Sequence, residues 1–516
     1  MPDEVMTIKQ LLNQVATRYP DRRGFIEANN PDRSDLTFSE MNGRARRFAN
    51  FLSDRGVTKG DRVAIISESI MEYAVAFFGI TKLGAIPATI HRREGVDVIS
   101  ALIEELDADV LLFQSRFSDL VERLESDAGA LECIALEERN DRPKFAESAA
   151  REARTYSDSE PDVAVSGSDR AFIIYTSGST SEPNPVVHTH EAAIEYTHLS
   201  GIAWTITPGD VVLNTRTPSF VGWLKGLPFT NVGGTVVFVE EWTPESVLET
   251  IDEYDISFMT QNPTQWSKIV QANENGACDL SSLRMMLYTG NKITSDLFDR
   301  VREQINENLT TCYGGSETIG PCTLLPLDEV SVETRNSIGR ENVQCDIRIV
   351  DPKRRDPAAE VDRGDTGEVI VRAPTVTSEI WNDPETTREL IHEDGWWLSG
   401  DIGYLDEDGF IYIEGRADNM IISGGINIYP EAVKDELEHH PGIDEVVVVG
   451  TTHEEWGETL KAYVRSNDES ITKAGLKAWC KDNDSIANYQ RPRFWAFVDE
   501  FPRTSTNKID RSALEE

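Results

Sequence analysis

The sequence has few basic residues for its length. Of 516 residues, 50 are Lys or Arg whereas 90 are Asp or Glu, so the formal net charge is −40. Sequence-independent binding to nucleic acid or to an anionic membrane needs a basic surface that displaces counterions. We therefore expect neither a nucleic acid nor an anionic membrane as a partner.

Acidic residues are spread along the whole chain and do not form a terminal tail. An acidic surface of this kind is typical of proteins that stay soluble in concentrated salt, where charge repulsion is screened within a few ångströms. One interpretation is a halophilic cytosol. The alternative is an ordinary acidic cytosolic enzyme, because net charge bears on solubility alone.

The chain also lacks cysteine clusters and long apolar runs. Its six cysteines include no Cys-x-x-Cys pair, so neither a disulfide framework nor a zinc site is predicted. The most apolar stretch, residues 73–90, contains Lys82, Gly84 and Pro87 and is too short to span a bilayer. We expect a buried helix there, followed by a turn and a strand. The first residues lack a basic region followed by an apolar one, so we predict no secretory signal and a cytoplasmic location.

Apolar residues recur alternately at helical and at strand spacing. The length predicts about two to four domains. Residues 37–55 predict a helix with a Thr-x-x-Glu capping pair at its start, and residues 98–106 predict another. Short apolar runs predict buried strands at 62–66, 108–113 and 255–259. This alternation predicts an α/β fold with parallel, doubly wound sheets.

The pattern changes in the last third of the chain. From about residue 350, short strands such as 367–372 and 409–413 are separated by Asp/Gly turns, which predicts a β-rich subdomain. After Arg416 we expect a small α+β unit, with a helix at 430–439 and a strand at 446–449.

A loop rich in hydroxyl groups follows the apolar run 171–175. Hydroxyls and exposed backbone N–H groups are what a loop needs to hold phosphate oxygens. Such loops are also often ordinary turns, and the chain has no Walker sequence. The residues of this candidate phosphate loop are Thr176, Ser177, Gly178, Ser179 and Thr180.

Further segments carry groups that suit a nucleotide. Residues 312–317 combine an aromatic ring, two glycines, a hydroxyl and a carboxylate, which can stack a base, approach a phosphate and hold Mg²⁺. Asp401 offers a carboxylate for a ribose diol, and Arg416 offers a guanidinium for a phosphate. A polar loop near the end of the chain presents Lys508. Each segment also has an ordinary interpretation as a turn, a solvated charge or a frayed tail.

Taken in this order, these segments resemble the adenylate-forming superfamily, which comprises acyl-CoA synthetases, firefly luciferases and peptide-synthetase adenylation domains. The resemblance covers nearly the whole chain. It implies an N-terminal AMP-binding domain at residues 1–417 and a mobile C-terminal domain at 418–516. It also implies ATP, Mg²⁺ and CoA as the small molecules used, together with a carboxylic acid.

The resemblance implies a role for each matching residue. Tyr313 would stack on the purine, Ser316 would bind the α-phosphate, and Asp401 would hold the ribose hydroxyls. Asp418 would be the hinge between the domains. The ATP- and AMP-binding residues would be Thr176, Ser177, Gly178, Ser179, Thr180, Gly290, Asn291, Tyr313, Gly314, Gly315, Ser316, Asp401, Arg416 and Lys508.

The implied catalytic residues are Lys508, Thr176 and Glu317. Lys508 would bridge the carboxylate and the α-phosphate during adenylation, and Glu317 would bind Mg²⁺. Gly424 and Gly425 would line the tunnel for the pantetheine arm of CoA. The implied reaction is attack of a carboxylate on the α-phosphate of ATP, release of pyrophosphate, and transfer of the acyl group to a thiol. Catalysis would then come mainly from alignment and charge neutralisation.

The phosphate loop departs from the family pattern. Ser181, Asn184 and Pro185 stand where the family has Gly, Lys and Gly, so a cation is missing and two backbone positions are less free. Asn507 replaces a glycine before the lysine, a milder change because Asn tolerates unusual backbone angles. Either a modest loss of rate or a degenerate nucleotide-binding homologue would fit these changes.

The acyl pocket is represented by two residues, Trp223 and Gly314. Trp223 resembles the Gly-Trp-x-Lys segment of medium-chain and acetyl-type synthetases, although a packed core tryptophan is an equal alternative. Acetate-specific members have Trp where Gly314 stands here, so acetate is disfavoured and a medium-chain, branched or aryl acid is expected. A carrier-loading adenylation enzyme stays open, and no residue excludes luciferase-like oxidation.

Overall fold

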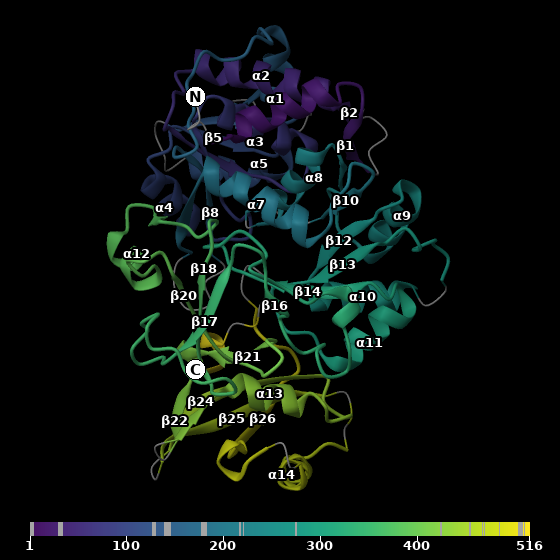
Figure 1. Cartoon of the computed structure of the whole chain (residues 1–516), viewed down its shortest axis with the longest axis vertical. Coiled ribbons are helices and arrows are strands. Elements are labelled where there is room, and N and C mark those ends of the chain that lie inside the picture. The colour runs from purple at the N-terminus through teal and green to yellow at the C-terminus, as the bar shows by residue number, and fades with distance from the viewer. Residues whose placement is uncertain are drawn as a thin grey trace.

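The computed structural model describes residues 5–28, 35–125, 131–138, 146–176, 183–215, 218–219, 221–273, 276–423, 426–453, 456–466, 468, 470–483, 486–503, 509 and 511–515. Two large sheets, a four-stranded sheet and a C-terminal five-stranded sheet organise these residues. Figure 1 shows the C-terminal sheet at the opposite end of the molecule from α1 (Ile8–Arg18) and α2 (Phe38–Asp54).

The first large sheet has eight strands in the order β19-β9-β8-β4-β3-β5-β6-β7. Its strands from β8 to β7 run parallel, whereas at one edge β9 pairs antiparallel with both β8 and β19. The strand predicted at 62–66 is confirmed, and the strand predicted at 108–113 begins two residues later, at Val110. The bounds are β3 (Arg62–Ile66), β4 (Ile86–Thr89), β5 (Val110–Phe113), β6 (Glu132–Ala135), β7 (Glu147–Ser148), β8 (Arg170–Tyr175), β9 (Pro185–Thr189) and β19 (Glu379–Ile380).

The second large sheet has nine strands in the order β16-β15-β14-β13-β12-β10-β11-β1-β2. The strands from β14 to β1 are parallel, so their carboxyl ends meet at one edge. The strand predicted at 255–259 begins later, at Phe258, because Asp255 adopts a left-handed conformation that ends the preceding helix. The bounds are β1 (Arg23–Glu27), β2 (Leu36–Thr37), β10 (Val211–Asn214), β11 (Thr235–Phe238), β12 (Phe258–Gln261), β13 (Met285–Tyr288), β14 (Leu309–Tyr313), β15 (Thr323–Leu324) and β16 (Arg340–Glu341).

Helices cover both large sheets. The helix predicted at 37–55 is α2, and its predicted capping box is present, with the Thr37 and Glu40 side chains each accepting from the other's backbone N–H. The apolar stretch 73–90 forms α3 and β4 as expected. Other helices of the described residues are α3 (Met71–Lys82), α4 (Val96–Leu106), α5 (Ser118–Glu125), α6 (Ala149–Glu152), α7 (His190–Ala203), α8 (Gly226–Val232), α9 (Pro244–Tyr254), α10 (Pro263–Ala272), α11 (Ser295–Gln304) and α12 (Pro384–Leu390).

A β-rich part follows, as predicted. The four-stranded sheet has the order β17-β18-β20-β21 and is antiparallel throughout. β18 matches the predicted strand 367–372, and β21 begins two residues later than the predicted 409–413. The bounds are β17 (Asp346–Val350), β18 (Gly367–Arg372), β20 (Trp397–Leu405) and β21 (Ile411–Arg416).

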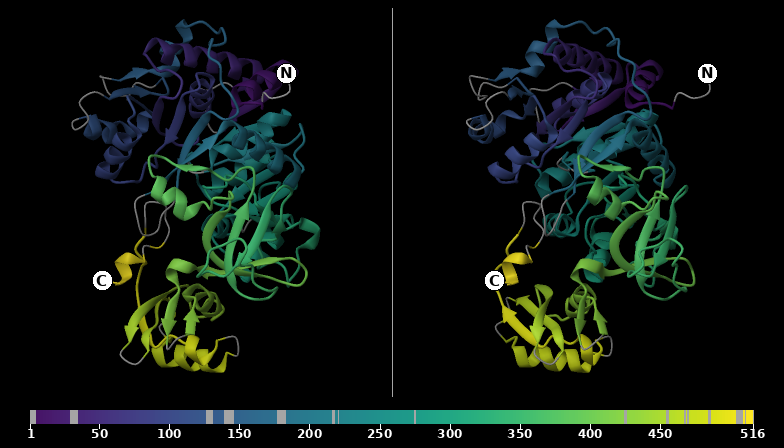
Figure 2. Two further views of the ribbon diagram at one scale, coloured as in Figure 1. Left: turned by 60° about the vertical axis from the view of Figure 1, so that its left-hand side comes forward. Right: turned by 90° about the vertical axis from the view of Figure 1, so that its left-hand side faces the viewer.

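The C-terminal sheet has its own hydrophobic core, formed by residues such as Leu437, Val446 and Leu460. Figure 2 shows this unit below the rest of the chain in two further views. The predicted helix after Tyr429 and the predicted strand 446–449 are both present. The bounds are β22 (Ile421–Ser423), β23 (Ile426–Ile428), α13 (Pro430–Leu437), β24 (Glu445–His453), β25 (Gly457–Arg465), α14 (Lys473–Asp482), β26 (Phe494–Phe497) and α15 (Ser512–Glu515).

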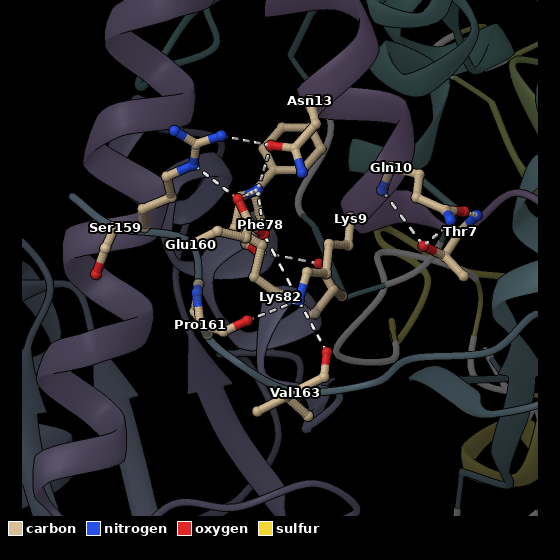
Figure 3. Close-up of polar contacts among 12 residues, drawn as sticks. Thr7, Lys9, Gln10, Asn13, Phe78, Lys82, Ser159, Glu160, Pro161 and Val163 are labelled. Atoms are coloured by element: carbon tan, nitrogen blue, oxygen red, sulfur yellow. Dashed lines mark hydrogen bonds and ion pairs between the residues drawn. The ribbon is translucent and has the colours of Figure 1, made fainter.

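Residues 156–169 lead into β8 and are fastened to α1 and α3 by a buried ionic network (Figure 3). Lys82 Nζ lies 3.2 Å from both carboxylate oxygens of Glu160 and donates to Asn13 Oδ1 at 2.9 Å. Lys9 Nζ donates to the carbonyl oxygens of Pro161 and Val163. Lys82 is fully buried, and burial lowers the pKa of its ammonium to about 8 despite the attraction of Glu160.

No helix within the described ranges is both long and apolar enough to cross a membrane.

Candidate active site

The carboxyl end of β14 meets the four-stranded sheet at Tyr313. The Tyr313 hydroxyl donates to Asp401 Oδ2, and its ring stacks on Trp397 with the centroids 6.2 Å apart and an interplanar angle of 27°. Burial, reinforced by the Asp401 charge, raises the pKa of Tyr313 well above its ordinary value. Tyr313 is therefore a neutral donor whose ring position is fixed by two contacts.

Asp401 also pairs with Arg416, its partner across β20 and β21. Arg416 Nη1 lies 3.2 Å from Asp401 Oδ1 and donates to the Ser399 carbonyl at 2.7 Å, while Nη2 lies 3.1 Å from Asp418 Oδ2. Burial raises the pKa of the Asp401 carboxyl, although Arg416 acts in the opposite direction. Each Asp401 oxygen accepts one hydrogen bond and has capacity for another, which a diol could use.

Gly400 permits this arrangement. Its φ is +71°, and a Cβ there would lie 2.9 Å from Arg416 Nη2. A side chain at 400 would be strained and would displace the guanidinium. Gly400 therefore leaves the space that the Arg416 guanidinium occupies next to Asp401.

The turn after Tyr313 is joined to the β8–β9 hairpin. The Ser316 hydroxyl donates to the Tyr175 carbonyl at 3.2 Å, and His188 Nε2 lies 2.8 Å from the Ser316 carbonyl oxygen. Thr176 stands at the end of β8, where its Oγ1 accepts from the Asn184 N–H at 3.1 Å. The hairpin thus places Ser316 beside Tyr175, the residue that precedes Thr176, and a phosphate-binding role for Thr176 and Ser316 stays a prediction.

The Glu317 carboxylate lies against Gly315, because a Cβ on residue 315 would be 2.6 Å from Glu317 Oε2. Its backbone oxygen accepts from the Thr377 N–H at 2.7 Å. Burial raises the pKa of this carboxyl, with smaller and opposing effects of Arg416 and Asp401. Within the part of the chain that the structure describes, the carboxylate forms no ion pair.

Glu317 could therefore bind a cation, but not within a cluster of protein ligands. No group of three or more His, Cys, Asp or Glu side chains suited to a metal occurs among the described residues. Mg²⁺ commonly takes one or two carboxylates and completes its shell with water and substrate phosphates. The site fits Mg²⁺ that arrives with a nucleotide.

Gly290 and Asn291 form an exposed turn directly after β13, the neighbour of β14. The next residue, Lys292, forms an ion pair of 2.6 Å with Asp435 of α13. The turn predicted to bind the nucleotide is thus joined to the C-terminal unit. Seven predicted site residues lie outside the described residues: Ser177, Gly178, Ser179, Thr180, Gly424, Gly425 and Lys508.

Trp223 lies in the hydrophobic core. It is 1% exposed, stacks on Phe238 at 5.7 Å and receives the edges of Tyr73 and Phe78. This is the packed-core alternative that the sequence left open. Its indole Nε1 has no hydrogen-bond partner among the described residues. A function of Trp223 in an acyl pocket stays a prediction.

Gly314 is surrounded closely by backbone. A Cβ at this position would lie 2.2 Å from the Gly320 carbonyl oxygen. The turn at 318–320 therefore occupies the direction in which a larger side chain would project. That this glycine leaves room for a longer acid also stays a prediction.

Sequence reasoning missed three residues of this site: Trp397, His188 and Thr377. Trp397 orders Tyr313, whereas His188 and Thr377 hold the backbone of Ser316 and Glu317. No motif marks them, because each acts through a contact made across a large sequence separation. A buried histidine within an apolar strand was the one signal available at His188.

Comparison with known proteins agrees with this geometry. The family model described as AMP-binding enzyme matches residues 12–381, and that described as AMP-binding enzyme C-terminal domain matches residues 433–508. The chain is 29% identical to the long-chain-fatty-acid–CoA ligase FadD13 of Mycobacterium tuberculosis, over 98% of this chain and 97% of that protein. It is 31% identical to a feruloyl-CoA synthase of an Amycolatopsis species, over 92% of each chain.

A solved structure has the same fold. O-succinylbenzoate coenzyme A synthetase (MenE) of Bacillus subtilis, in complex with ATP and magnesium ion, matches with a TM-score of 0.84 at 24% identity, covering 98% of this chain and 99% of that chain. The first family model alone covers more than two thirds of the sequence. The chain therefore belongs to the AMP-binding enzyme family, the adenylate-forming superfamily that includes the acyl-CoA synthetases.

Proposed function

We propose that this protein is an ATP-dependent acid–CoA ligase that forms an acyl-AMP and then an acyl-CoA. The observation that carries the proposal is the Tyr313–Asp401–Arg416 arrangement with Glu317 beside it. It supplies a ring for a base, acceptors for a ribose diol, a fixed cation and a carboxylate for Mg²⁺. Relatives named as fatty-acid and feruloyl-CoA ligases support the same activity.

The residues of this chain act mainly by alignment. The Tyr313 ring would hold the purine, Asp401 the ribose, and Arg416 the phosphate side of the nucleotide. Ser316 and Thr176 offer hydroxyls where the turn and the hairpin meet, near the expected α-phosphate. Mg²⁺ supplies positive charge to the pyrophosphate when bound. Lys508 would approach the attacking carboxylate and neutralise charge as the bond forms.

A boundary near residue 417 would let the C-terminal unit move between two half-reactions. Arg416 and Asp418 lie on either side of that point and are ion-paired at 3.1 Å. Rotation here would remove Lys508 after adenylation and bring Gly424 and Gly425 to the thiol channel. We retain Asp418 as the hinge and the ranges 1–417 and 418–516 as the two domains.

We propose a medium-chain, branched or aryl acid as the substrate, which would place the protein in fatty acid or aromatic acid metabolism. The fatty-acid and feruloyl-CoA relatives fit this range, and Gly314 in place of a tryptophan disfavours acetate. We also propose a cytoplasmic location, and the formal net charge of −40 supports a halophilic cytosol as part of the same proposal. Loading of a carrier protein is the second candidate activity.

The test is AMP formation from ATP and Mg²⁺ in molar KCl, with acids from acetate to dodecanoate and with benzoate, each with and without CoA. AMP that depends on one acid and on CoA is the expected result. AMP formed only when a phosphopantetheinyl carrier replaces CoA would identify the carrier-loading activity. No AMP with any acid, from folded protein that binds ATP, would contradict the proposal and favour a degenerate homologue.

Two variants separate the half-reactions and the effect of the loop. Lys508→Ala should abolish adenylate formation yet still convert a supplied acyl-adenylate to the thioester. Unchanged activity in both steps would show that Lys508 has another function. Restoring the family residues with Asn184→Lys and Pro185→Gly should raise the adenylation rate if the altered loop limits it.

A further inference from the structure

Two cysteines that the proposed chemistry does not use face each other close to Tyr313. Cys322 precedes β15 and is 1% exposed, and Cys345 lies in the turn before β17. The Cys322 carbonyl accepts from Asn342 N–H at 2.9 Å, and the Asn342 carbonyl accepts from Cys345 N–H at 3.1 Å. This turn folds residue 345 back toward residue 322, and Cys345 packs against the hydrophobic cluster that contains Cys322. The Cys322 thiol donates to the Gly320 carbonyl at 3.7 Å.

The two thiols differ in their pKa values. The neighbouring Cys322 thiol lowers the pKa of Cys345, whereas the Cys345 thiol and burial raise the pKa of Cys322 well above its ordinary value. A thiolate is the reactive form of cysteine. Cys345 is therefore the more nucleophilic member of the pair.

The two cysteines also differ in their exposure to solvent. Cys345 lines a surface cavity of about 490 Å³ together with Gln344, Asp346, Arg372 and Thr377. Cys322 is sealed within the hydrophobic cluster that contains Trp397 and Ile349. A small solute can therefore reach Cys345 from the cavity, while Cys322 is available only to Cys345.

We propose that Cys345 and Cys322 form a reversible disulfide, with Cys345 as the peroxide-reactive thiol and Cys322 as the resolving thiol. Cys345 thiolate attacks hydrogen peroxide, the O–O bond breaks, and a sulfenic acid and one water result once a proton is taken up. The Cys322 sulfur then attacks the Cys345 sulfur, the S–O bond breaks, and a second water leaves. Two thiols are oxidised, one peroxide is reduced to two waters, and a dithiol reductant reverses the change.

The disulfide would act on the base-binding end of the nucleotide site. The Cys322 N–H donates to the Tyr313 carbonyl at 2.8 Å, and the Tyr313 N–H donates to Thr323 Oγ1 at 3.2 Å. A covalent link at Cys322 pulls on the same backbone that carries Tyr313. We expect oxidation to raise the KM for ATP about fivefold, at the low end of usual coupling between sites. This coupling rests on the proposed function, whereas formation of the disulfide does not.

The experiment treats the reduced full-length protein with hydrogen peroxide, alkylates the remaining thiols, and analyses an unreduced digest by mass spectrometry. The expected result is the loss of two thiols and a cross-linked peptide pair containing Cys322 and Cys345, reversed by dithiothreitol. Cys345→Ser should abolish the cross-link and Cys345→Ala should do the same. The matched control Cys480→Ser, at a buried cysteine of the C-terminal core, should leave it intact.

The outcomes are separable from those of the proposed activity. Cys345 that is oxidised beyond the sulfenic acid without a cross-link, or a cross-link through Cys312 or another cysteine, would overturn the pairing. A disulfide that forms while the KM for ATP stays equal in oxidised, reduced and Cys345→Ser protein would overturn the coupling. If the protein forms no AMP at all, thiol counting and the cross-link still decide the pairing.

Discussion

Removing the charge of Glu160 tests whether the buried network of Figure 3 determines stability. Glu160→Gln keeps the shape and one acceptor, but it leaves the fully buried Lys82 without a negative partner. Glu160 also accepts from Arg46 Nε at 2.7 Å, so a second charged contact weakens. Breaking a buried ion pair usually destabilises a protein because one charge is left uncompensated.

The expected magnitude follows from the pKa of Lys82. Lys82 can avoid an uncompensated buried charge by losing its proton. For a group with a pKa of about 8, deprotonation at pH 7 costs about 1.4 kcal/mol. Weakening the contact with Arg46 adds about 1 kcal/mol. We expect Glu160→Gln to lower the free energy of unfolding by about 2–3 kcal/mol at pH 7, and by less at pH 9, where Lys82 is already mostly neutral.

The pH dependence has a definite sign. The pKa of Lys82 is lower in the folded protein, about 8, than the ordinary 10.5. Between these values the unfolded chain binds more protons, so this group makes stability increase with pH. Glu160→Gln lowers the pKa of Lys82 in the folded protein further, so the pH range in which stability increases begins at a lower pH. The difference in free energy of unfolding between the variant and the wild type should therefore decrease from pH 6 to pH 9.

The assay is denaturant unfolding of wild type and variants at pH 6, 7 and 9. Asp158→Asn is the matched control, because Asp158 pairs with Arg47 at 2.9 Å on the same segment but is 61% exposed. An exposed pair contributes about 0–1 kcal/mol. Adding Lys82→Met to Glu160→Gln should recover part of the loss. A cost for Glu160→Gln no larger than that of Asp158→Asn, or a cost independent of pH, would refute the reasoning.

Three further predictions concern the site and its surroundings. Glu317→Gln should raise the Mg²⁺ concentration for half-maximal AMP formation about tenfold, the value of one charged contact; an unchanged Mg²⁺ titration would remove Glu317 from the metal site. His188→Leu should slow adenylation about tenfold, whereas His188→Gln retains a donor for the Ser316 carbonyl and most of the rate; equal rates for both variants would refute this positioning role. Burial lowers the pKa of His188 and of His190 to about 4, so the unfolded chain binds more protons between pH 4 and 6.5 and stability should fall as pH drops through that window. Denaturant unfolding at pH 7 and pH 5 measures the fall, and a His188→Gln variant as pH-sensitive as the wild type would contradict the assignment.

The amino-acid sequence by itself determined the local elements and the chemical groups of the site. The capping pair of α2, the apolar run of β18 and the Tyr-Pro start of α13 are each specified by neighbouring residues, so spacing alone predicts them. The glycines and hydroxyls of residues 313–317 and the Asp401 segment were also legible, because their chemistry belongs to residue type and order.

Only the tertiary structure decided which groups meet. Trp397 stacks on Tyr313 and His188 reaches Ser316 because separate sheets bring their ends together. Trp223 lies in an aromatic core. The sequence alone could not decide between a core position and a position in the acyl pocket. The proximity of Cys322 and Cys345 could likewise not be predicted, because the six cysteines show no paired spacing in the sequence. Propensity and spacing act over a few residues, whereas these contacts depend on sheet order and packing across the whole chain.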